Sequence, residues 1–410
     1  MSVVIGLLPA TLPLAAGGQA AGLLVDLFVV LFAAKAGDEL FKRIRQPAIV
    51  GEILAGVLVG PAVLGVVQPS ITLEVFAELG VVFLLFWVGL ETRISDLRAV
   101  GSSAFLTGVL GVVLPFAGGF GLGMALGEST STSTFLGAAL VATSVGITSA
   151  VLIELGALAS RAGRTIIGAA IVDDILAMLI LAVAVGAASG GTDVVGLVVV
   201  VLLALGFVAF FALGGTTLMR RQPRILHAPR FSESPLLPAV ILCLGLAAIA
   251  AEIGLAAIIG AFLAGMMVAE TKEHHPIEAE VAPLYAFFPP FFFVFIGMQI
   301  DLHALSRPGT IALLVGVTAL AVATKFVGAW LGARSLGPAD ATFVGAGMVP
   351  RGEVGIIVAG IGRASGVIDE QVFAVVVGMS VLTTLAVPPV LRALARRMPV
   401  DTAGFEARSP

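Results

Sequence analysis

The chain has 410 residues, of which 59% are hydrophobic and only 12% are charged. Because soluble domains are about 25% charged, this composition excludes an ordinary water-soluble protein. The net charge of −4 comes without a basic tract, so nothing favours nucleic-acid binding. The long apolar runs predict an all-α polytopic membrane protein, since a transmembrane barrel would show short alternating segments.

Thirteen apolar segments, separated by short polar turns, are each predicted to cross the membrane as a helix. They span residues 21–41, 47–66, 72–91, 100–126, 134–156, 163–188, 193–219, 235–251, 254–270, 282–302, 308–333, 341–362 and 371–395. The eighth and ninth are separated only by the turn from Ala251 to Gly254, where one long bent helix is the alternative.

The positive charges give the orientation of this helix array. Of the 22 Lys and Arg residues, eighteen fall in the odd-to-even turns and the C-terminal tail, and two fall in the opposite turns. Since Lys and Arg accumulate on the cytoplasmic side, we expect the N-terminus outside and the C-terminus in the cytoplasm. We predict that the chain is an integral protein of a prokaryotic inner membrane.

A few charged residues lie near the middle of a predicted span: Asp173 and Asp174 in the sixth, Lys325 in the eleventh, and Arg351 and Glu353 in the twelfth. An ionisable group at that depth is costly and indicates a site for a cation, a proton or both. Three acidic residues lie nearer the span ends, where a structural or interfacial role is favoured: Glu52, Glu78 and Glu154.

Two predicted helices carry breaking residues at their midpoints. The fifth has Thr143, Ser144 and Gly146 there, and the twelfth has Pro350 and Gly352. Pro removes a backbone donor and Gly loosens a helix, although either feature alone is common in membranes. The two interruptions are seven helices apart, and such pairs at matching positions of inverted repeats indicate a secondary-transporter site.

The predicted organisation is therefore two inverted six-helix repeats around crossed broken helices 5 and 12. The first repeat covers residues 21–188, and the second covers residues 235–397. Residues 1–20 are expected to form a leader, residues 189–234 a linker helix and cytosolic loop, and residues 398–410 a short cytosolic tail.

The chemistry of the site follows from its residue types. Adjacent helical positions differ by about 100° in direction, so Asp173 and Asp174 cannot point the same way. The hydroxyls of Thr143 and Ser144 and the carbonyls freed by the break are hard oxygen ligands for a small cation. We expect Asp174 to bind the ion and carry the proton, while Asp173 pairs with Lys325 and releases it when the ion arrives.

A cation and protons would compete for these oxygens, so alternating exposure of one site would give obligate exchange. Two protonatable positions permit two protons per monovalent cation, and hence electrogenic exchange. For Arg351 and Glu353, neutralisation of the broken helix ends, or of each other, is the favoured role. The predicted protein is a transporter without a cofactor, and not an enzyme.

Seven stretches of the sequence form a recognisable set: Gln46 to Pro61, Phe86 to Glu91, Thr143 and Ser144, Asp173 and Asp174, Phe295 to Met298, Thr324 and Lys325, and Gly347 to Glu353. In these stretches the chain resembles the monovalent cation:proton antiporter-2 family, the sodium/proton exchangers of the NapA type and their Kef-like relatives. Together the stretches extend over essentially all of residues 20–397.

The resemblance implies a homodimer, with a dimerisation domain and a mobile six-helix core, each built from both repeats, that carries the site across the membrane like an elevator. It implies Na⁺ at Asp174, Asp173, Thr143 and Ser144, and Lys325 as the partner of Asp173 and a possible proton carrier. Unlike Kef-like members, this sequence shows no C-terminal nucleotide-binding domain, so we expect a constitutive, pH-responsive exchanger.

Alternatives remain at this point. A potassium/proton antiporter of the Kef-like type is the first, because oxygen ligands alone do not separate Na⁺, Li⁺ and K⁺. A sodium-coupled organic anion symporter can share inverted repeats but needs no Asp pair. An intramembrane aspartyl protease needs carboxylates from two helices, whereas Asp173 and Asp174 are adjacent on one predicted helix.

Four histidines at helix ends or in turns are better explained as interfacial than as pH sensors: His227, His274, His275 and His303.

Overall fold

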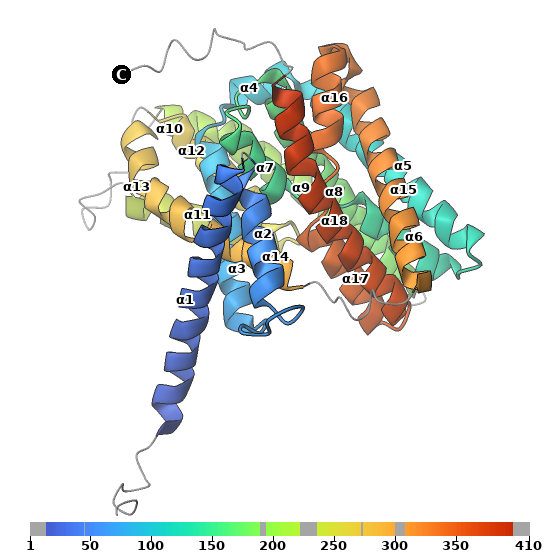
Figure 1. Ribbon diagram of the computed structural model, residues 1–410. Coiled ribbons are helices and arrows are strands. Elements are labelled where there is room, and N and C mark those ends of the chain that lie inside the picture. The colour runs from blue at the N-terminus through green and yellow to red at the C-terminus, as the bar shows by residue number, and fades with distance from the viewer. Residues whose placement is uncertain are drawn as a thin grey trace, which may run out of the picture.

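The computed structural model describes residues 14–44, 46–188, 194–221, 236–271, 274–299 and 308–396, and within these ranges the chain forms helices and no strand (Figure 1). The elements are α1 (Leu14–Arg43), α2 (Ala48–Val59), α3 (Ile71–Leu90), α4 (Ile94–Ala99), α5 (Gly101–Ala125), α6 (Thr130–Val141), α7 (Val145–Glu154), α8 (Arg161–Ala188), α9 (Val194–Ala209), the π-helical η1 (Phe210–Gly215), α10 (Thr216–Arg221), α11 (Leu236–Glu252), α12 (Ala257–Ala269), α13 (His274–Phe287), α14 (Pro289–Met298), α15 (Pro308–Ala333), the 3₁₀ turn η4 (Arg334–Leu336), α16 (Pro338–Gly347), α17 (Glu353–Ala364) and α18 (Glu370–Ala395).

Each predicted apolar segment coincides with one or more of these helices. Within the described ranges, eight helices are long and apolar enough to cross a membrane, and four apolar helices are shorter, at 10–17 residues. The prediction of an all-helical membrane protein is thus confirmed, whereas the count of thirteen crossings and the inverted repeats stay predictions. The first thirteen residues of the predicted leader, the predicted tail from residue 398, His227 and His303 lie outside the described residues, as do the side chains of His274 and His275.

The doubtful boundary between the eighth and ninth predicted helices is a true break. Helix α11 ends at Glu252 and α12 begins at Ala257. Between them Gly254 has a φ of 84°, a left-handed conformation that glycine adopts without a steric penalty. The alternative of one long bent helix is therefore wrong.

The tenth predicted segment contains a local interruption, because α13 ends at Phe287 and α14 begins at Pro289, although Ile277–Met298 together form one candidate span. Pro289 and Pro290 open α14, and the proline ring fits the first turn of a helix because the missing N–H would have no partner there. The apolar count also placed the start of this segment too late. Helix α13 begins at His274, in a polar stretch that includes Glu278 and Glu280.

The helices pack as two groups. A core group contains α5, α6, α8 and α15 to α18, and a scaffold group contains α1, α2, α3 and α11 to α14. Helix α7, which continues α6 beyond a break, packs on α8 and α18 of the core group and on α2 and α3 of the scaffold group. Figure 1 shows the scaffold group on the left and most of the core group on the right, with the N-terminal half of α1 projecting beyond its neighbours.

The scaffold group is held by very close backbone contacts at glycines. A methyl group at Gly56 in α2 would lie 2.0 Å from the carbonyl oxygen of Val294 in α14. The reverse also holds, because a methyl group at Gly297 would lie 2.0 Å from the carbonyl oxygen of Ile53. Small residues let membrane helices approach in this way. Two of the stretches that carry the family resemblance therefore pack against each other.

Candidate ion-binding site

Two helices of the core group are interrupted where the sequence predicts. Helix α6 ends at Val141 and α7 begins at Val145, and α16 ends at Gly347 before α17 begins at Glu353. The unwound segments lie against each other. Three hydrogen bonds join the two broken helices, from Ser144 N–H to the Pro350 carbonyl (2.9 Å), from Thr143 Oγ1 to the Met348 carbonyl (3.4 Å) and from Thr148 Oγ1 to the Gly347 carbonyl (2.8 Å).

The two carboxylates of α8 point in different directions, as adjacent helical positions must. Asp173 is fully buried, and its Oδ1 lies 2.5 Å from Nζ of Lys325 in α15, which is also fully buried. Asp174 is 4% exposed and lines a pocket. The structure therefore gives the two aspartates different surroundings.

Lys325 has a second partner that the sequence does not reveal. Its Nζ donates to the carbonyl oxygen of Val141 at 2.7 Å. Val141 is the last residue of α6, so this carbonyl belongs to the negative end of a half-helix. One ammonium group thus compensates both the Asp173 carboxylate and an interrupted helix end.

Arg351 takes the corresponding position at the second break. Its guanidinium is fully buried and donates to the carbonyls of Met348 (3.4 Å) and Val349 (3.2 Å), which follow the end of α16, and to the carbonyl of Ala321 in α15 (3.4 Å). It also lies within electrostatic reach of Asp173. The side chain of Glu353, predicted to share this role, lies outside the described part of the chain.

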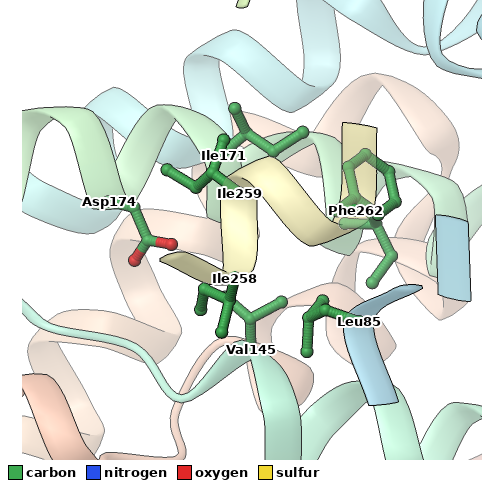
Figure 2. A pocket seen from close by; sticks show the side chains of 8 residues that line it. Leu85, Val145, Ile171, Asp174, Ile258, Ile259 and Phe262 are labelled. Carbon is green, nitrogen blue, oxygen red and sulfur yellow. The ribbon is translucent and has the colours of Figure 1, made fainter. Parts of the chain in front are cut away.

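Asp174 faces a small pocket formed by α3, α7, α8 and α12 (Figure 2). The other lining residues are all apolar: Leu85, Val145, Ile167, Ile171, Ile258, Ile259 and Phe262. Low-dielectric walls focus the field of a charge, so a cation in this pocket would meet Asp174 as the one charged lining residue. The pocket lies where the core and scaffold groups meet.

Glu52 and Glu154 make other contacts and do not line this pocket. Glu52 in α2 lies 3.8 Å from Nζ of Lys35 in α1. Glu154, the last residue of α7, accepts the N–H of Ala48 at the start of α2 (3.0 Å) and lies 3.9 Å from Arg392 in α18. These contacts agree with the interfacial role that the sequence favours for the two glutamates.

Sequence reasoning missed two residues that reach the second break. Arg351 N–H donates to Thr383 Oγ1 at 3.2 Å, and Thr384 Oγ1 donates to the Arg351 carbonyl at 2.7 Å. Hydroxyl residues are ordinary at helix contacts in membranes, so a Thr-Thr pair in an apolar span carries little signal of its own.

The chain is similar to known proteins over most of its length. The family model described as "Sodium/hydrogen exchanger, transmembrane" matches residues 27–396. The Na(+)/H(+)-K(+) antiporter GerN of Bacillus cereus is 38% identical over 90% of this chain and 95% of its own length. The high-affinity Na(+)/H(+) antiporter NhaS3 of Synechocystis is 35% identical, with 91% and 90% of the two chains covered. The solved structure of the sodium proton antiporter MjNhaP1 from Methanocaldococcus jannaschii has the same fold, with a TM-score of 0.67, 17% identity, and coverage of 92% of this chain and 99% of that one.

The buried ion pair gives a prediction about stability. Replacing Lys325 by Met leaves Asp173 without its partner, and breaking a buried pair in this way costs about 3–5 kcal/mol. We expect thermal unfolding of the purified variant in detergent to shift down by many degrees, because the buried carboxylate loses its counter-charge. The double variant Asp173→Asn/Lys325→Met should recover most of the loss. Equal melting temperatures for wild type and Lys325→Met would contradict the structural role of the pair.

Proposed function

Because the chain belongs to the sodium/hydrogen exchanger family, we propose that it exchanges a monovalent cation, Na⁺ above all, for protons across the membrane. The observation that carries this proposal is Asp174, the one charged residue lining an apolar pocket, beside a buried Asp173–Lys325 pair. Cation/proton antiport is also the activity named for the relatives GerN and NhaS3, which align over most of their length.

In the proposed mechanism Asp174 is both the ion ligand and the proton carrier. A cation entering the pocket takes the oxygens of Asp174 and Asp173, with Thr143 and Ser144 of the first break adding neutral oxygens. Asp173 must then turn from Lys325, whose bond to the Val141 carbonyl can hold the ammonium in place. Protonation of the same carboxylates expels the cation, so the two substrates cannot occupy the site together.

Potassium/proton exchange is the second candidate. The relative GerN carries K(+) as well as Na(+) in its name, and it is 38% identical to this chain. Selectivity between the two ions depends on cavity size and ligand geometry rather than on ligand type.

One prediction from the proposed exchange concerns Asp174. We expect Asp174→Asn, which keeps the side-chain shape but removes the charge, to reduce Na⁺-induced dequenching of a pH dye in everted vesicles to background. Glu74→Gln, which removes an exposed carboxylate from α3, is the matched control and should behave like wild type. Normal Na⁺/H⁺ exchange by Asp174→Asn would refute the assignment. In the wild-type protein, dequenching by K⁺ but not by Na⁺ would select the potassium alternative.

Another prediction concerns the stoichiometry of exchange. Two carboxylates allow two protons to enter for each monovalent cation that leaves, so we propose that exchange is electrogenic. In proteoliposomes containing Na⁺, an imposed inside-negative potential should accelerate Na⁺ efflux, because net positive charge moves inward in each cycle. A rate that does not respond to the potential would establish one-for-one exchange instead.

We further propose a homodimer in which the scaffold group forms the dimer interface and the core group carries the site across the membrane. The position of the pocket between the two groups supports such a motion, since sliding one group would change which side the pocket faces. Apolar side chains exposed on the projecting half of α1, such as Leu24 and Phe28, offer contact area for a partner or for lipid. The N-terminus would lie outside and the C-terminus in the cytoplasm.

This motion can be followed with spin labels on the two groups. Val63, after α2, and Glu128, between α5 and α6, are both exposed and outside the pocket. In purified protein of dimeric mass, we expect two populations of the Val63–Glu128 distance whose ratio changes when Na⁺ is added. A single distance under all conditions would argue against movement of the core group as a unit.

A further inference from the structure

Two adjacent threonines in α18 bind the backbone N–H and C=O of one residue in the second break. Thr383 accepts the N–H of Arg351, and Thr384 donates to the carbonyl of the same residue. All three residues are at most 1% exposed. Both backbone groups of Arg351 are therefore satisfied by hydroxyls from another helix.

This peptide needs such partners because of where it lies. Arg351 falls between the end of α16 and the start of α17. Its N–H and carbonyl lack partners from a regular helix, and no bulk water reaches them at this depth. A buried backbone group without a partner is strongly destabilising, above all in a membrane.

The two hydroxyls are suited to opposite tasks. The Thr383 hydroxyl has its own acceptors in α18, the carbonyls of Met379 and Ser380, each at 3.0 Å, which leaves its lone pairs for the Arg351 N–H. The Thr384 hydroxyl instead uses its proton on the Arg351 carbonyl. A hydroxyl can act as donor and acceptor, whereas the isosteric valine can do neither.

Arg351, whose backbone the two threonines bind, carries one of the positive charges near the site. The Arg351 guanidinium reaches the carbonyl of Ala321, one turn before Lys325 on α15, and lies within electrostatic reach of both Lys325 and Asp173. A shift of the Arg351 backbone would move this positive charge relative to the aspartates. The affinity of the pocket for a cation depends on that arrangement.

We propose that Thr383 and Thr384 are positioning residues for cation binding, which act by fixing the unwound peptide of Arg351. The inference rests on the proposed cation/proton exchange for its transport readout. Helix α18 would thus contribute to ion affinity without supplying an ion ligand.

The test compares variants of each threonine in proteoliposomes. Thr384→Val and Thr383→Val keep the side-chain shape but lose the hydroxyl, and we expect the apparent KM for Na⁺ to rise about five- to tenfold, with a smaller change in maximal rate. Thr384→Ser and Thr383→Ser keep the hydroxyl and should stay within about twofold of wild type. Ser380→Ala is the matched control, because the Ser380 hydroxyl donates to Val376 within α18, and its KM should not change.

The outcomes separate this inference from the proposed function. A wild-type protein that exchanges Na⁺, with valine variants of unchanged KM, would overturn the role of the threonines alone. Serine variants as impaired as the valine variants would show that the methyl groups matter, and would overturn it as well. No exchange by wild type would overturn the proposed function first. If a valine variant does not fold, Thr384→Cys replaces it, and a weak thiol donor should give an intermediate KM.

Discussion

One buried ammonium group joins the parts of the site. Lys325 binds the Asp173 carboxylate of α8 and the last carbonyl of α6 at once, so it couples three helices at a single point. Neither partner could be buried at this depth without a compensating charge or donor. In the proposed mechanism, this second contact would still partner the Lys325 ammonium when Asp173 turns to the ion. An ammonium group with Asp173 as its one partner would be left without a partner at that step.

The buried charges described around the two breaks have different partners. Asp173 pairs with Lys325 and lies within electrostatic reach of Arg351, whereas Asp174 lines the pocket. Lys325 and Arg351 also donate to carbonyls at the end of α6 and just beyond the end of α16. In the proposed exchange, a cation and protons compete for the same two carboxylates, so this competition alone would couple the two fluxes.

The sequence predicts those parts of the site that side-chain chemistry marks. Charges in an apolar span are costly, so Asp173, Asp174 and Lys325 stand out without a structure, and so do breaks rich in Gly and Pro. The partner of Lys325 on α6 could not be predicted in this way, because every residue has a carbonyl and only the fold decides which one is near. Thr383 and Thr384 were missed for a related reason, since their function lies in a backbone contact across two helices. The division of the tenth segment at Pro289 was missed because its first half, α13, is too polar to resemble a span.

Both helix groups contain close glycine contacts, and the core group also has buried polar contacts between its helices. Glycine contacts at Gly56 and Gly297 bring backbones of the scaffold group so close that sliding between those helices would cause clashes. In the core group, a methyl group at Gly328 in α15 would lie 2.4 Å from the Leu110 carbonyl oxygen in α5. Hydrogen bonds also join the broken helices to α15 and α18, and the Asp173–Lys325 pair joins α8 to α15. Between the groups lie the apolar walls of the Asp174 pocket, the packing of α18 on α2, and the hydrogen bond from Ala48 N–H to Glu154. Apolar surfaces have no fixed hydrogen-bond partners to lose when they slide, which is compatible with the proposed movement of the core group against the scaffold group.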